Sequence, residues 1–117
     1  MTPKRGERAA PPAANGEWEV RFGTNSAAKG WDQLCIQVPE NTRRVFDLLR
    51  MHPRSVPPTE RHHRLKGQLA VGAHRGSALE QWQYEVTGGG RIWYLIDDAS
   101  HTLWIQHAGP GHPKATD

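Results

Sequence analysis

The sequence predicts an α+β domain in which an N-terminal strand and a helical hairpin pack on a mainly antiparallel sheet of four to five strands. Apolar residues recur at helical spacing between residues 24 and 51, whereas strand patterns separated by turn residues occupy residues 79–107. A chain of 117 residues suits one domain. We expect this domain to span residues 16–117 and to follow a disordered leader at residues 1–15, which is rich in Pro, Ala and charge.

The first strand is predicted at residues 17–22, where polar and apolar side chains alternate. A helix is expected to follow, because Thr24, Asn25 and Ser26 are all residue types that cap a helix N-terminus. Its apolar positions recur every three to four residues: Ala27, Trp31, Leu34, Cys35 and Val38. Cys35 is therefore predicted to be a packed core thiol, and the following Pro39 is predicted to end the helix.

A second helix is predicted to begin after a cap at Asn41 or Thr42. Its apolar stripe comprises Val45, Phe46, Leu48 and Leu49. Prolines at positions 53, 57 and 58 exclude regular structure at residues 52–59. We then expect a strand at residues 61–69 and an exposed loop at residues 71–77, which hold two glycines and several polar side chains.

An antiparallel meander of three strands is predicted at residues 79–107. Positions 82, 84 and 86 are apolar and positions 83 and 85 are polar, as expected of a strand with one buried face. The glycines at 88–90 permit a tight turn, and polar residues at 97–100 form a second one. Residues 91–96 and 101–107 are rich in aromatic and β-branched side chains, which favour strands.

The charge distribution favours an anionic partner, although the formal net charge is only +3. Residues 52–75 contain five Lys or Arg, four His and one acidic side chain, and phosphate is the commonest partner of such a stretch. The single cysteine excludes an intrachain disulfide, and no apolar run approaches the roughly 20 residues that cross a bilayer. We expect a cytoplasmic protein that does not bind membranes.

No metal or other cofactor is expected. His62 and His63 are adjacent, so on a strand their side chains point to opposite faces and do not chelate one ion. The chain also lacks a Cys pair, a His-Glu-x-x-His sequence and a Walker phosphate loop.

Three short motifs and the order of the predicted elements resemble the RelE/ParE toxin superfamily over residues 17–114. The motifs are Leu65-Lys66-Gly67, Arg91-Ile92-Trp93-Tyr94 and Gly111-His112-Pro113-Lys114. The resemblance implies the toxin of a type II toxin–antitoxin system, with a cognate antitoxin protein as partner in a hetero-oligomer. RelE-like members cleave messenger RNA in the ribosomal A site, whereas ParE-like members inhibit DNA gyrase. Gln83 and Glu85 stand where many members carry arginine.

RNA cleavage through the 2′-hydroxyl requires a base, an acid and cations at the phosphate. Arg91 is the leading candidate for the phosphate, and it matches the functional arginine of the family; the alternative is an ion pair with Glu85 across the hairpin. His107 and His112 are candidate acids or bases; the alternatives are a hydrogen-bonded histidine at a strand end and a tail histidine. Tyr94 matches a tyrosine that is sometimes functional in the family, but alternation with Ile92 and Ile96 also permits a core position.

Further basic residues are candidates for RNA binding: Arg61, Arg64, Lys66, Arg75 and Lys114. Lys66 is also a candidate catalytic residue that holds the scissile phosphate, and the alternative for it and its neighbours is a solvated basic surface. Together with the resemblance to RelE-like toxins, these residues predict a ribosome-dependent mRNA endonuclease. A non-enzymatic gyrase inhibitor and a nucleic-acid-binding module without cleavage activity are the alternatives.

Overall fold

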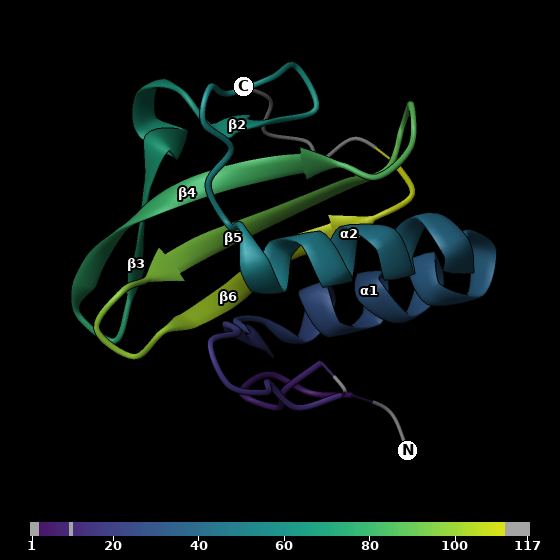
Figure 1. Ribbon diagram of the computed structural model, residues 1–117, viewed down its shortest axis with the longest axis horizontal. Helices are drawn as coiled ribbons and strands as arrows, with labels where there is room; N and C mark the ends of the chain where they lie inside the picture. Colours follow the sequence, from purple (N-terminus) through teal and green to yellow (C-terminus); the bar gives the residue numbers. More distant parts are fainter. Residues whose placement is uncertain (1–2, 10, 112–117) are drawn as a thin grey trace.

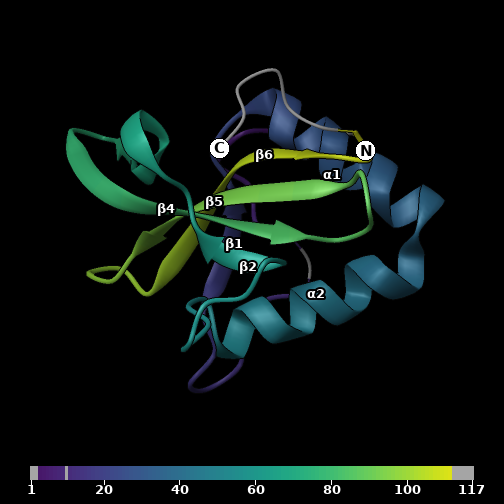
Figure 2. The same cartoon turned by 90° about the horizontal axis from the view of Figure 1, so that it is seen from above.

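The computed structural model describes residues 3–9 and 11–111 and has an α+β architecture, in which two helices cover one face of a mixed six-stranded sheet (Figure 1). The strand order is β1-β6-β5-β4-β2, and β3 also pairs with β4. Seen from above, the end of the sheet that holds β3 and β4 projects away from both helices (Figure 2). No helix in the described ranges is long and apolar enough to cross a membrane.

The first strand and the first helix form where the sequence predicts them. β1 comprises Glu19–Phe22, and α1 comprises Asn25–Gln37. The side chain of Thr24 caps α1, because its Oγ1 accepts the backbone N–H of Ala27 at 2.9 Å. Cys35 is exposed, however, so the prediction of a core thiol is wrong: the neighbouring Leu34 takes the buried position on this turn.

The second helix, α2, comprises Pro39–Met51 and begins earlier than the predicted caps. Pro39 occupies the first turn, where its missing N–H costs nothing and its fixed φ suits the helix. Thr42 is therefore a helix residue, and its hydroxyl donates to the carbonyls of Leu34 and Val38 at 3.0 and 2.8 Å. Pro39 thus both ends α1 and opens α2.

The remaining elements confirm the meander and correct the segment before it. These elements are β2 (His62–Arg64), a 3₁₀ helix, η1 (Gly67–Ala70), β3 (Val71–His74), β4 (Ser77–Glu85), β5 (Arg91–Asp97) and β6 (Thr102–Gly109). The strand predicted at residues 61–69 is only three residues long, and the loop predicted at residues 71–77 contains β3. Arg75 and Gly76 both have positive φ, at 50° and 82°, which is the geometry of a two-residue hairpin turn joining β3 to β4.

β1 forms backbone hydrogen bonds along both of its edges. It pairs in parallel with β6, and residues 6–9 of the leader pair with its other edge. The N–H of Gly6 donates to the carbonyl of Phe22 at 2.7 Å, and the N–H of Ala9 donates to the carbonyl of Val20 at 2.7 Å. This part of the leader therefore differs from the predicted disorder, because its backbone completes the sheet edge.

β6 contains a β-bulge at Gln106. Trp93 of β5 lies opposite His107, but the next residue, Tyr94, lies opposite Ile105, so Gln106 has no register partner. Beyond the bulge, each side chain of β6 points to the face opposite to the one that strict alternation would give it. Ile105 and Ala108 belong to the helix-covered core, whereas His107 shares the other face with Trp93.

α1 approaches β6 closely at Gly30. A Cβ atom built at Gly30 would lie 1.5 Å from the carbonyl oxygen of Ala108, which is a backbone atom. Only glycine therefore permits this distance between the helix and the sheet. The contact fixes where β6 lies relative to both helices.

We expect Gly30→Ala to destabilise the protein by about 1–3 kcal/mol, because helix and sheet must separate. Helix propensity alone would favour alanine by about 1 kcal/mol, so the sign of the change tests the close contact. Urea unfolding would measure it. Gly88→Ala is the matched control, since a Cβ atom there meets nothing within 4 Å. An unchanged or increased stability of Gly30→Ala would contradict the packing of α1 on β6.

Candidate nucleic-acid interface

The strand register arranges side chains in rows on the sheet face that lacks helices, which we call the helix-free face. The first row comprises Arg61, Glu85, Arg91 and Gly109. The second row comprises His63, Gln83, Trp93 and His107. The third row comprises Gln81, Leu95, Trp104 and Arg21. A row in which Glu85 separates two arginines therefore lies directly beside a row that has a histidine at each end.

The side chain of Arg91 forms hydrogen bonds with the backbone of the turn that precedes β5. Its Nη1 donates to the carbonyls of Thr87, Gly88 and Gly90 at 3.1–3.2 Å and lies 3.8 Å from Oε1 of Glu85. The ion pair considered as an alternative is thus present. All of these contacts use Nη1, and the side chain is only 11% exposed. Arg91 consequently stabilises the β4–β5 turn while it holds positive charge one row from His107.

His107 is a half-buried histidine at the β6 end of the second row. Its ring lies 5.8 Å from that of Trp93, and among the described residues its buried Nε2 has no hydrogen-bond partner. Burial lowers the pKa of His107, which favours the neutral ring that accepts a proton. Trp93 is itself held in place, because its Nε1 donates to Oε1 of Gln83 at 2.7 Å.

His63 lies at the β2 end of the second row. It is not among the catalytic or RNA-binding residues that the sequence predicts. Its Nδ1 lies 3.1 Å from the carbonyl oxygen of Thr59, and its strand partner is Gln83. The side-chain period alone places residues 61, 63 and 65 on one face. What the sequence lacks is a signal that β2 pairs with β4 rather than with the strand that follows it.

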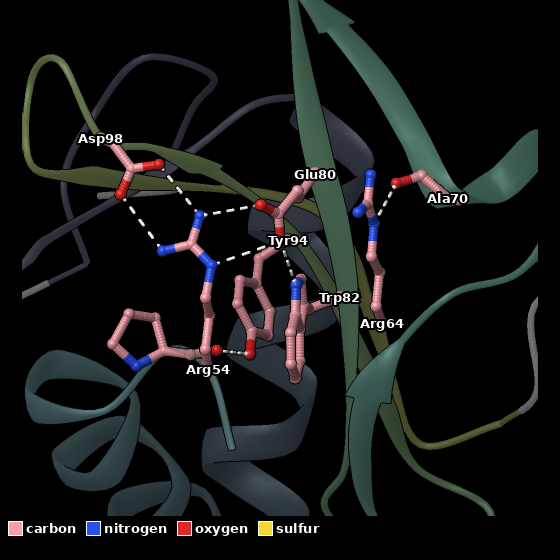
Figure 3. Close-up of polar contacts among 8 residues, drawn as sticks. Arg54, Arg64, Ala70, Glu80, Trp82, Tyr94 and Asp98 are labelled. Atoms are coloured by element: carbon pink, nitrogen blue, oxygen red, sulfur yellow. Dashed lines mark hydrogen bonds and ion pairs between the residues drawn. The ribbon is translucent and has the colours of Figure 1, made fainter. Parts of the chain in front are cut away.

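The other predicted basic residues lie around this face rather than in one cluster. Arg64 and Lys66 line an open cleft of about 560 Å³ at the β2 edge, and Arg64 donates from Nε to the carbonyl of Ala70 at 3.0 Å (Figure 3). Arg75 lies at the β3–β4 turn, with its guanidinium 5.4 Å from the centroid of Trp104. His112 and Lys114 lie outside the described residues. The structure thus places Arg61 and Arg91 in the first row and His107 at the β6 end of the second row.

Arg54, a member of the basic stretch, connects three segments of the fold. Arg54 forms ion pairs with Glu80 and Asp98 at 3.1 and 2.9 Å, and Glu80 also accepts the indole N–H of Trp82 (Figure 3). The contacts with Arg54 lower the pKa of both carboxyl groups. This network ties the proline-rich loop to β4 and to the β5–β6 turn, so Arg54 is already neutralised by protein carboxylates.

His62 and Tyr94 form a buried hydrogen-bonded pair under this loop. The hydroxyl of Tyr94 donates to the carbonyl of Pro53 at 2.6 Å, and Nε2 of His62 contacts the same hydroxyl. Burial raises the pKa of Tyr94 and lowers that of His62 to about 4. Tyr94 is fully buried, as alternation permits, and does not face the rows described above.

Comparisons of the chain with protein-family models, with curated proteins and with solved structures find no match. The RelE/ParE resemblance therefore stays a prediction from the three motifs. The described residues contain no group of three or more His, Cys, Asp or Glu side chains placed to bind a metal ion. The two rows offer guanidinium groups, imidazoles, an amide and the carboxylate of Glu85 as their chemical groups.

We expect His62 to make the protein less stable in mild acid. Because the pKa of His62 is about 4 in the folded chain and near 6.5 in the unfolded chain, the unfolded chain binds the proton first as the pH falls. The stabilisation is complete above about pH 6.5 and is lost towards about pH 4, by at most about 3 kcal/mol. Urea unfolding at several pH values should show a shallower dependence in His62→Gln. The exposed His52, changed to Gln, is the control, and equal slopes in His62→Gln and the unchanged protein would contradict the assignment.

Proposed function

We propose that this protein is a toxin of the RelE kind, a ribosome-dependent endonuclease that cleaves messenger RNA through its 2′-hydroxyl. One observation carries the proposal: the row with Arg61 and Arg91 lies beside the row that ends in His107. The element order strand, helix, helix and antiparallel meander supports it as well, since the same order underlies the resemblance to RelE/ParE toxins. A cognate antitoxin would cover this basic face.

In this mechanism neutral His107 takes the proton of the 2′-hydroxyl, which then attacks the adjacent phosphorus and leaves a 2′,3′-cyclic phosphate. Arg91 stabilises the charge that grows on the phosphate oxygens. Its position two residues from Trp93, the partner of His107, makes it a diagonal neighbour at about 7–8 Å, which an arginine side chain spans. The lowered pKa of His107 keeps the base form dominant at neutral pH.

His63 does not act on the same phosphate. Three strand spacings separate it from His107, which amounts to about 14 Å. An acid and a base that share one phosphate must both lie within hydrogen-bond reach of it. Together with Arg61, His63 instead suits a neighbouring phosphate of the bound strand. The departing 5′-oxygen is protonated by another donor, such as solvent.

Cleavage would be tested by mapping messenger RNA ends by primer extension, with and without ribosomes. We expect His107→Asn to reduce cleavage at least about 100-fold, because a general base contributes on that order. Arg91→Lys should reduce it too, since lysine keeps the charge but loses the planar fork. His52→Asn is the control, as His52 is exposed and outside the rows. Arg91→Lys is preferred to Arg91→Ala, because alanine also removes the contacts that hold the β4–β5 turn.

Full cleavage by a folded His107→Asn protein would overturn the assignment of the base. Intact RNA together with inhibited supercoiling would instead favour the gyrase inhibitor. RNA binding without new ends would favour a binding module that does not cleave.

RNA affinity gives an independent prediction. Arg61 is exposed on the first row, so Arg61→Gln should weaken binding of single-stranded RNA and reduce the slope of log affinity against log salt by about 0.7. Fluorescence anisotropy at several salt concentrations measures this slope. Arg44→Gln is the matched control, because Arg44 is exposed on α2 behind the sheet. Identical slopes for Arg61→Gln and Arg44→Gln would remove Arg61 from the interface.

A further inference from the structure

A second polar cleft lies beside Trp104, where the leader, β6 and the β3–β4 hairpin meet. We call it the Trp104 cleft; its volume is about 450 Å³, within the range of small-molecule sites. Its lining includes Arg5, Gly23, His74, Arg75, Trp104 and Gln106. A smaller cleft of about 320 Å³ shares part of this lining and adds Asp97. None of the catalytic roles proposed above uses these side chains.

The walls of the Trp104 cleft are fixed by contacts between distant segments. Nη1 of Arg21 donates to the carbonyl of Gly6 at 2.8 Å and holds the leader against β1. The backbone N–H of Arg5 donates to Oδ1 of Asn25 at 2.9 Å. On the opposite wall the ring of His74 stacks on that of Trp104, with 4.0 Å between centroids. The cleft is therefore a built feature of the fold.

Two residues that line this cleft each carry a buried polar atom with no hydrogen-bond partner among the described residues: Nε2 of His74 and Oε1 of Gln106. Buried polar atoms in folded proteins are normally paired, so each such atom requires an explanation. Gly23 makes room for the amide of Gln106, because a Cβ atom there would lie 1.8 Å from Oε1. A bound molecule with hydrogen-bonding groups would satisfy both atoms.

The chemistry of the lining selects the class of ligand. Oε1 of Gln106 only accepts hydrogen bonds, so it requires a donor such as a hydroxyl and disfavours a bare anion. Arg5 and Arg75 are exposed cations that favour a phosphate. Trp104 is only 6% exposed and is covered by His74 and Arg75, so it offers no free ring face for a base.

Asp97 sets the orientation of such a ligand. Its Oδ2 lies 3.4 Å from Nε1 of Trp104, and it lines only the smaller cleft. Its negative charge repels a phosphate from that end, whereas Arg5 lines only the larger cleft. The phosphate is thus directed towards Arg5 of the leader, and the hydroxyls are directed towards Gln106.

We propose that the Trp104 cleft binds a phosphorylated sugar, with its phosphate at Arg5 and Arg75 and a hydroxyl at Gln106. The proposal goes beyond the proposed function, since binding here requires no cleavage. Two sources supply this chemistry: a free sugar phosphate, or a ribose phosphate within an RNA strand.

Isothermal titration of the full chain with ribose 5-phosphate, ribose and inorganic phosphate tests the proposal. Ribose 5-phosphate should bind at least about tenfold more tightly than either fragment, because it satisfies both ends of the cleft. Gln106→Leu should weaken ribose 5-phosphate about tenfold and leave inorganic phosphate unchanged. Arg75→Gln should weaken both, whereas Arg44→Gln should weaken neither. A single-stranded oligonucleotide that displaces ribose 5-phosphate identifies RNA as the source, and failure to displace it identifies a free sugar phosphate.

The proposal is overturned if ribose 5-phosphate binds no more tightly than inorganic phosphate. It is also overturned if Gln106→Leu and Arg75→Gln, both shown to be folded by circular dichroism, bind ribose 5-phosphate as the unchanged chain does. RNA cleavage does not enter either readout. Failure of the endonuclease proposal and failure of this one are therefore distinguishable.

Discussion

The one-residue bulge at Gln106 is the constraint on which both sites depend. Strict alternation along β6 would place Ile105 and His107 on the same face, because side chains repeat every two residues. The extra residue instead leaves Ile105 in the core and turns His107 to the helix-free face. The bulged residue itself is held by Thr24, whose Oγ1 donates to its carbonyl at 3.3 Å, and its side chain occupies the space above Gly23.

Curvature of the sheet divides the helix-free face into two parts. β3 and β6 are separated by β4 and β5 in the strand order, yet His74 of β3 stacks on Trp104 of β6. The sheet must therefore bend over itself at this end. Gly72 allows the bend, because a Cβ atom there would lie 2.6 Å from Cδ2 of Leu95, which is fully buried although no helix covers it. The bend creates the walls of the Trp104 cleft and leaves the row of Arg61 and Arg91 at the other end.

Features encoded locally could be read from the sequence, and features set by strand pairing could not. The Thr24 cap and the meander follow from neighbouring residues, and both are confirmed. The bulge and the pairing of β2 with β4 depend on contacts between residues far apart, so the sequence does not indicate His63 as a site residue and predicts a loop where β3 forms. The prediction that Cys35 is buried is wrong for a simpler reason. Its spacing fits the apolar stripe of α1, but the neighbouring Leu34 occupies the buried position.

The basic residues of this chain lie in two different settings, paired within the fold or exposed on its surface, which composition does not distinguish. Arg50 contacts Glu17 and the carbonyl of Pro12, and Arg54 is shared by two carboxylates, so these cations are used within the fold. In Arg54 the Nε, Nη1 and Nη2 atoms are all paired with carboxylates, so this guanidinium gains little from a phosphate, because it must first give up charge-assisted hydrogen bonds. Arg61 and Arg75 are exposed on the two parts of the helix-free face. Both proposed ligands depend on the position of these two side chains, rather than on the net charge of the chain.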